Sequence, residues 1–217
     1  MKTRILLIVT TAVLMLLVSL PARTQDNSSV AVKKFEVGAE FSTLTFNPDE
    51  TVLGLGGRLS YNLNKHFALE AAAYFFPQAC DYCGRHAGHT TEGLFGVKVG
   101  KRFQKWGIFA KARPGVISFS QGRFDEQIVP TNPPSFTFTQ KRLTTFAADL
   151  GGVLEFYPSK RIITRFDFGS TIIHFGRTRT NFFAFDPVTG GFTLIPSEIP
   201  AQTGGTLQIM AGVGFRF

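Results

Sequence analysis

Hydrophobic and polar residues alternate with a period of two through most of the chain beyond residue 34. Such stretches cover residues 35–42, 53–61, 66–75, 92–102, 108–116, 146–156, 162–172 and 207–217. In the first stretch, Phe35, Val37 and Ala39 alternate with glutamate and glycine. A period of two places alternate side chains on opposite faces of a β-strand. The pattern therefore predicts an all-β protein with eight antiparallel strands.

The segments between the expected strands alternate in length. Tight turns fall at 62–65, 104–105 and 157–160, and long segments at 77–90, 120–140 and 177–203, while the segment at 47–50 is short. Short periplasmic turns and long outer loops are typical of outer-membrane barrels. We therefore expect an up-and-down transmembrane β-barrel.

The N-terminal residues have the layout of an export signal. Lys2 and Arg4 are followed by an apolar run from Ile5 to Leu20 and then by small residues. A membrane anchor is the alternative, but the run is short for a span of about 20 apolar residues and no stop-transfer charges follow. We expect residues 1–24 to be a signal peptide, cleaved near Ala22 to Thr24, and residues 25–217 to form one barrel domain exported to the outer membrane.

The composition agrees with a surface that faces lipid. Only 18% of the residues are charged, against roughly a quarter in soluble domains. Aromatic residues gather near the two ends of the expected strands, which predicts two girdles at the lipid–water interfaces. The turn-end girdle would comprise Tyr61, Phe67, Phe103, Trp106, Phe156, Tyr157, Phe215 and Phe217. The loop-end girdle would comprise Phe41, Phe46, Phe75, Phe76, Phe119 and Phe175.

The strand phase places acidic and basic residues in equal numbers inside the expected barrel. The inward acids are Glu36, Glu40, Glu70, Glu92, Asp149, Glu155 and Asp167, and the inward bases are Arg58, Lys98, Arg102, Lys111, Arg113, Arg165 and Arg216. An eight-stranded barrel is just wide enough for its side chains to fill. Cross-strand ion pairs satisfy charges that would be costly alone. The interior is therefore expected to be a salt-bridged plug rather than a wide pore, although small water pockets and slow leakage are compatible with it.

The formal charge of +8 has a specific location. Removing Lys2, Arg4 and Arg23 of the N-terminal segment leaves +5. The interior is balanced, and this surplus falls on the turn side, at Lys33, Lys34, Lys65, Lys101, Lys105, Lys160 and Arg161. Anionic lipid headgroups are the natural partners of such a periplasmic rim. Nucleic-acid binding is not expected, because no basic patch lies among accessible aromatic residues.

The last strand carries an unbroken outward apolar stripe from Leu207 to Phe217. With the export signal and the eight strands, this ending, Gly212 to Phe217, resembles the outer-membrane β-barrel family that includes the OmpA and OmpX type barrels. The resemblance implies an assembly signal at Phe215 and Phe217, read by the barrel assembly machinery. It also implies a structural or surface-interaction role, with no catalytic residues and no cofactor. No peptidoglycan-binding domain follows the barrel, and we expect a monomer.

One loop collects cysteine and histidine residues. Cys80, Cys83, His86 and His89 recur at every third position and are candidate zinc ligands. A disulfide between the two cysteines, or plain loop polarity, is the favoured alternative, since disulfides persist in oxidising compartments. Covalent haem attachment is not expected, because Gly84 stands where the histidine would be required.

A lipid-modifying enzyme is the rival class of function. Lipid A deacylases and acyltransferases of this architecture combine a serine, a histidine and an acid near one interface. His174 lies at the outer end of its strand and points outward by phase, but no serine follows at the spacing of the deacylases. We therefore favour a non-enzymatic barrel with a structural or surface-interaction role, whose long loops contact the environment, with an extracellular ligand as one option. The loops at 120–140 and 177–203 could equally extend the sheet above the membrane, which we favour over a dedicated binding site.

Overall fold

The computed structural model describes residues 33–47, 50–78, 88–129, 135–186 and 191–217. Ten strands lie in these ranges: β1 (Phe35–Asn47), β2 (Glu50–Asn62), β3 (Phe67–Phe76), β4 (Thr90–Arg102), β5 (Trp106–Val129), β6 (Ser135–Phe156), β7 (Ile162–Phe175), β8 (Thr178–Asp186), β9 (Gly191–Ile199) and β10 (Gln202–Arg216). Within the described residues, no helix is long and apolar enough to cross a membrane. The expected signal peptide lies outside the described residues.

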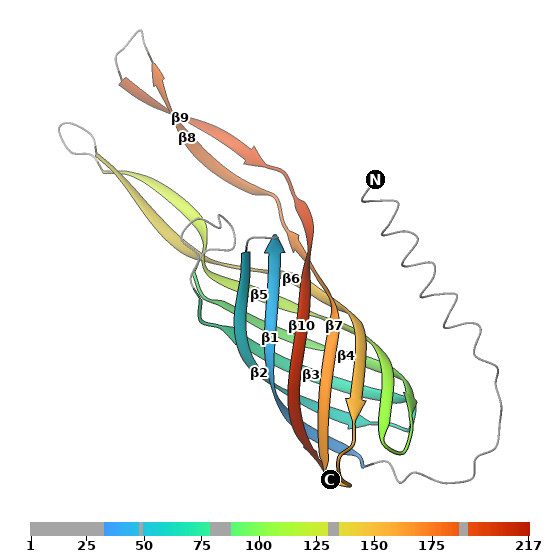
Figure 1. Cartoon of the computed structure of the whole chain (residues 1–217). Coiled ribbons are helices and arrows are strands. Elements are labelled where there is room, and N and C mark those ends of the chain that lie inside the picture. The colour runs from blue at the N-terminus through green and yellow to red at the C-terminus, as the bar shows by residue number, and fades with distance from the viewer. Residues whose placement is uncertain (1–32, 48–49, 79–87, 130–134, 187–190) are drawn as a thin grey trace.

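Eight of the strands close into a barrel. The order around it is β1-β10-β7-β6-β5-β4-β3-β2, and the strands that pair do so antiparallel. The predicted all-β, eight-stranded up-and-down barrel is therefore confirmed (Figure 1). β1 and β10 close it in a register that runs from Glu36 opposite Arg216 to Thr45 opposite Leu207.

The expected long loops at 120–140 and 177–203 contain β structure. β5 and β6 stay paired up to Val129 opposite Ser135, with a register shift between Phe119 and Arg123. β8 and β9 form a separate two-stranded sheet. Figure 1 shows both hairpins projecting from the same end of the barrel, which is the end opposite the C-terminus. The barrel sheet is therefore extended at β5 and β6, as expected, whereas β8 and β9 form a sheet of their own.

The turns at the other end are short and held by side-chain caps. The Asn64 side-chain oxygen accepts hydrogen bonds from the backbone N–H groups of His66 and Phe67, at 2.7 and 2.9 Å. The Ser159 hydroxyl accepts from the N–H groups of Arg161 and Ile162. Asn and Ser favour turns because their side chains bond to nearby backbone in this way. These turns fix the register of the strand pairs that carry the interior charges.

The outward residues of the lower barrel, the part nearer the short turns, form an apolar band. Large exposed hydrophobic side chains point out from every barrel strand, and they include Phe41 on β1, Leu59 on β2, Phe95 on β4, Phe168 on β7 and Val213 on β10. Towards the hairpin end the outward positions become polar: Thr43 and Thr45 follow on β1, Thr91 on β4, Ser118 on β5 and Thr144 on β6. This change marks the upper edge of the band.

The interior also changes between the two ends of the barrel. Towards the turns it holds charged side chains, and towards the hairpins it holds an apolar cluster. This apolar layer consists of Leu44, Val52, Ala72, Tyr74, Phe76, Leu94, Ile117, Phe119, Ala147, Ile173, Phe175 and Met210, with Phe46 and Leu143 packed against it. The interior is therefore charged in its lower part and largely apolar in its upper part, and the apolar layer overlaps the top of the outward apolar band, where Leu53, Phe75 and Phe146 still point outward.

The predicted aromatic girdles are wrong in part for this reason. Phe76, Phe119 and Phe175 are buried inside the barrel, and Phe46 packs against them instead of facing lipid. Phe41 and Phe75 point outward, as expected of girdle residues. At the turn end, Tyr157 is also buried. The inward phenylalanines cannot reach a lipid interface, because successive side chains of a strand point to opposite faces.

Candidate functional site: the barrel interior and its mouth

The lower interior is filled by one connected network of ion pairs. Six acids and six bases take part, each with a partner of opposite charge: Glu36, Glu40, Glu70, Asp149, Glu155 and Asp167 with Arg58, Lys98, Arg102, Lys111, Arg113 and Arg165. All twelve are buried. We call this set the ionic layer. Its charges cancel, so the strands enclose no net charge there.

Arg165 on β7 is the centre of the ionic layer. Its guanidinium donates to Asp167 from two nitrogens, at 2.5 and 2.7 Å, and to both carboxylate oxygens of Glu70 on β3, one of them at 2.9 Å. A planar guanidinium can bind a carboxylate through two parallel hydrogen bonds, which a lysine cannot do. Arg165 therefore ties together strands on opposite sides of the barrel.

A second arginine binds the neighbouring acid. Arg113 on β5 donates to the same Asp149 oxygen from two nitrogens, at 2.9 and 2.5 Å, and Lys111 reaches that oxygen at 2.8 Å. Lys111 also bonds to Asp167, at 3.1 Å. The two acids thus share a lysine, which couples the two arginine centres.

The turn-end part of the ionic layer contains a tyrosine. Arg102 donates to Glu36 at 3.1 Å and to the Tyr157 hydroxyl at 2.9 Å, and that hydroxyl donates to Glu155 at 2.7 Å. Lys98 bonds to Glu155 and lies 3.3 Å from Glu70. Lys98 therefore links the turn-end group to the Arg165 centre.

Two of the predicted interior ion pairs do not form within the described residues. Glu92 accepts a hydrogen bond from the Gln208 amide at 2.8 Å and makes no ion pair. Arg216 lies opposite Glu36 in the strand register, yet its guanidinium donates to the carbonyl oxygens of Ser159 and Lys160 and covers the Tyr157 ring. The prediction that Glu92 and Arg216 take part in interior ion pairs was therefore wrong. Strand phase predicts which face of the sheet a side chain lies on, but not the direction in which a long side chain extends.

Inward glycines leave room for the long basic chains. A Cβ atom at Gly38 or at Gly214 would each lie 3.3 Å from the Arg58 guanidinium group, and the two glycines face each other across β1 and β10. Arg58 uses this space to donate to Glu40 at 2.5 Å. Side chains at both glycines would crowd Arg58 out of its present position.

The ionic and apolar layers meet at residues that belong to both environments. Tyr74 lies in the apolar layer and donates its hydroxyl to Glu40 at 2.6 Å. The Met210 sulfur, also in the apolar layer, lies 3.6 Å from Arg113 and 3.9 Å from Lys111. The apolar layer and the ionic layer therefore lie in direct contact inside the barrel.

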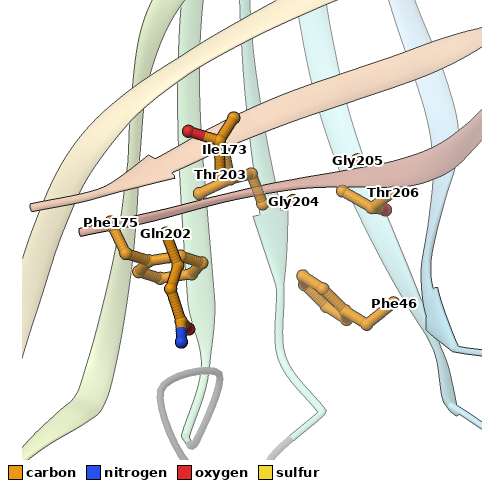
Figure 2. A pocket seen from close by; sticks show the side chains of 8 residues that line it. All are labelled: Phe46, Ile173, Phe175, Gln202, Thr203, Gly204, Gly205 and Thr206. Carbon is orange, nitrogen blue, oxygen red and sulfur yellow. The ribbon is translucent and has the colours of Figure 1, made fainter. Parts of the chain in front are cut away.

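A cavity of about 420 Å³ lies at the mouth, beside the apolar layer. Phe46, Ile173 and Phe175 line it from β1 and β7, and the segment 202–206 of β10 forms the rest (Figure 2). No charged side chain is among these lining residues. The walls of this cavity therefore combine apolar side chains with neutral polar ones. No motif of the sequence indicated it, because it depends on where β1 ends relative to β10.

The two predicted chemical sites are placed only in part. Cys80, Cys83 and His86 lie outside the described residues, and the ring of His89 packs 5.6 Å from that of Phe75. Zinc or a disulfide in this loop stays a prediction. His174 is exposed and its ring nitrogen Nδ1 lies 2.9 Å from the Thr203 hydroxyl. No acid bonds to the His174 ring within the described residues, so a complete acid–histidine–hydroxyl arrangement is not assembled there.

The assembly-signal residues lie on the closing seam. The Phe217 ring stacks on the Phe35 ring at 5.9 Å and lies 6.2 Å from the ring of Phe215. The backbones of Phe35 and Phe217 exchange two hydrogen bonds, at 3.1 and 2.9 Å. Recognition of these residues during assembly stays a prediction.

No family model and no curated protein matches the sequence. Several solved structures are similar in fold. The N-terminal β-barrel domain of Pseudomonas aeruginosa OprF aligns at 12% identity over 85% of this chain and 98% of that chain, with a TM-score of 0.45. Ail, the attachment invasion locus protein of Yersinia pestis, aligns at 10% over 85% and 97%, with a TM-score of 0.46. Neisserial surface protein A aligns at 14% over 84% and 97%, with a TM-score of 0.44.

Proposed function

We propose that this chain is an outer-membrane β-barrel with a non-enzymatic, structural or surface-contact role carried by its extracellular hairpins. The observation that carries the proposal is the contrast between the outward apolar band and the closed, ion-paired interior of the same strands. A band of outward hydrophobic side chains on a closed sheet is stable in lipid, where every backbone group must be paired within the protein. The filled interior argues against a role as a diffusion pore.

The hairpins β5–β6 and β8–β9 are the surfaces that would meet the environment. They project from the end opposite the short turns (Figure 1). The ends of β8 and β9 are tied by Glu198, which bonds to Arg179 at 2.9 Å and lies 3.4 Å from Arg177; both arginine side chains are largely exposed, and Glu198 is nearly half exposed. Paired strands hold such a surface in shape more firmly than an irregular loop would. A contact surface of this kind suits an extracellular ligand or a neighbouring macromolecule.

The basic rim at the turn end supports the orientation. Lys33, Lys34, Lys65, Lys101, Lys105, Lys160 and Arg161 are all exposed there. Positive side chains next to a membrane attract anionic headgroups, at about 1 kcal/mol each near the surface. We propose that this rim lies on the periplasmic leaflet, with the hairpins outside the cell.

Two measurements on the full chain in a Gram-negative host test the proposal. The folded protein should fractionate with the outer membrane and migrate differently on a gel before and after boiling. Protease added to intact cells should cut the hairpins and leave the barrel protected. A protein found in the soluble periplasmic fraction, with the same gel mobility before and after boiling, would contradict the proposed location. Cleavage only after the outer membrane is permeabilised would contradict the proposed orientation.

A lipid-modifying role is the second candidate, favoured only by the contact between His174 and Thr203. Catalysis by a hydroxyl nucleophile needs the histidine to accept its proton and a third group to orient the histidine. The non-enzymatic proposal predicts that His174→Ala leaves the lipid A profile of the native host unchanged. A changed profile, with unchanged protein level and heat shift, would favour the enzyme instead.

A further inference from the structure

We propose that the mouth cavity binds a single acyl chain of an amphipathic molecule, which enters sideways over the end of β1. The inference rests on the proposed membrane placement and goes beyond the surface-contact role. The volume of the mouth cavity, about 420 Å³, falls in the range of roughly 300–1,000 Å³ that is common for small-molecule sites. Its lining carries the apolar rings of Phe46 and Phe175 and no charge.

The entrance follows from unequal strand lengths at the seam. β10 pairs with β1 only up to Leu207, opposite Thr45, but it pairs with β7 as far as Gln202, opposite Phe175. Within the described residues, the segment 202–206 therefore has a strand neighbour on one side only. The wall of the barrel is lower on the β1 side, beside the cavity.

The height of this step matches the edge of the apolar band. Leu207, the last β10 residue paired with β1, is half exposed and points outward, and Thr43 and Thr45 on β1 begin the polar outer surface. An acyl chain lying along the band thus meets the step where lipid gives way to water. It can bend over the step and keep its methylene groups out of water inside the cavity.

The glycine in the middle of the segment provides the space. Gly204 lies opposite Ile173, and a Cβ atom built on Gly204 would meet no atom within 4 Å. Glycine inside a strand often marks a place where a ligand approaches the backbone closely. Figure 2 shows Gly204 on the stretch of β10 between Phe175 and Phe46.

The polar groups beside the cavity suit the head of the molecule. Gln202 carries an amide and Thr206 a hydroxyl, and both side chains line the cavity. Below, the apolar layer and then the ionic layer fill the barrel, so a bound chain has no way through. The site is therefore one of binding and not of transport.

The test uses the folded full-length protein in nanodiscs and palmitic acid that carries a photoreactive diazirine near its tail. Irradiation should label Phe46, Ile173, Phe175 or the segment 202–206, and excess unlabelled palmitic acid should suppress this labelling.

Gly204→Leu fills the cavity, and the loss of about two buried methylene contacts should weaken binding about tenfold. Gly93→Leu is the matched control, since a Cβ there also meets nothing within 4 Å but lies on the outer wall of β4. Its labelling should equal that of the unaltered protein.

A second arm uses nanodiscs in which a phosphatidylcholine carries the diazirine. Labelling of the cavity in this arm alone assigns the chain to a membrane lipid, and labelling by palmitic acid alone assigns it to a free fatty acid. Cavity labelling that is absent or unsaturable in both arms, or equal in Gly204→Leu and Gly93→Leu, overturns the proposal.

The heat shift on a gel is measured for every variant, and Ile173→Trp replaces Gly204→Leu if the latter does not fold. Failure of fractionation would count against the proposed function, whereas failure of labelling in a correctly inserted barrel counts against the acyl-chain site alone.

Discussion

The lower and upper parts of this barrel are built from the same strands in opposite senses. In the lower part the strands put Phe95 and Phe168 outward and Arg165 and Glu70 inward. In the upper part they put Ser118 and Thr144 outward and Ile117 and Phe119 inward. Strand alternation continues without interruption, and only the polarity of each face changes. The comparison teaches that one closed sheet can change the polarity of both faces along its length, with the apolar interior beginning beside the top of the outward apolar band.

The difference also divides the sources of stability. In the ionic layer, charges that are removed from solvent are retained because each has a hydrogen-bonded partner. In the apolar layer, stability comes from burial of hydrophobic surface and close packing. Each part should therefore respond to a different kind of substitution.

The largest effect is expected from breaking the ionic layer at its centre. Arg165→Leu leaves Glu70 and Asp167 buried without their main partner, and it should lower the free energy of unfolding by about 3–5 kcal/mol. The urea midpoint of the heat-modifiable band in lipid vesicles measures this. Arg161→Leu, the same change at an exposed turn, should stay within about 0.5 kcal/mol. Equal midpoints for the two variants would mean that the ionic layer does not stabilise the fold.

The outer surface gives the next largest effect and tests the height of the switch directly. Val97 and Thr91 both point outward from β4, one within the apolar band and one above it. Val97→Arg should cost about 2–4 kcal/mol of unfolding free energy, as charges near the bilayer midplane do, and Thr91→Arg about 0–1 kcal/mol. The same urea titration compares them. If Thr91→Arg proved as costly as Val97→Arg, the membrane would extend above the level assigned to it.

A smaller effect is expected in the apolar layer. Ile117 is completely buried, so Ile117→Val should lower stability by about 0.5–1.5 kcal/mol through the loss of one packed methylene group. Ile195→Val, on the exposed β8–β9 hairpin, should change it by no more than about 0.5 kcal/mol. Were the two variants alike in their urea midpoints, the upper interior would be loosely packed rather than a true core.

The smallest effect concerns conduction. Because the ionic and apolar layers fill the interior, the purified barrel in a planar bilayer should show no steady open-channel current in concentrated potassium chloride. A porin-type barrel inserted under the same conditions serves as the positive control. A stable current carried by the unaltered protein would show that the ionic layer opens, which the comparison of the two parts does not allow.

Strand phase alone predicted much of this arrangement. The alternation located the eight barrel strands and placed Arg58, Lys98 and Arg165 inside, since each lies an even number of residues from other inward positions. The same parity would have placed Phe46 and Phe76 inside, because Phe41 and Phe75 point outward. Their position near strand ends predicted a girdle instead, because aromatic rings generally prefer membrane interfaces. The structure follows the strand phase and places both rings inside the barrel.

Other features were beyond the sequence for physical reasons. Which groups Arg216 and Lys98 would meet depends on side-chain paths across the barrel, and these are set by all strands together. The mouth cavity depends on β10 continuing past the end of β1, and neither strand's own pattern records the length of its neighbour. That β8 and β9 form a sheet of their own, rather than an extension of the barrel sheet, likewise needed a three-dimensional structure.

The seam between β1 and β10 has a consequence for the time course of folding. It pairs Glu36 with Arg216, so its contacts join residues from nearly opposite ends of the described chain. Proteins rich in contacts between distant residues fold slowly, because the entropy of closing a long loop is lost before the contacts form. Until the seam forms, the sheet has two unpaired edges, which invite association with other chains. The rate at which this seam forms should therefore set the interval during which the nascent barrel depends on protection from aggregation.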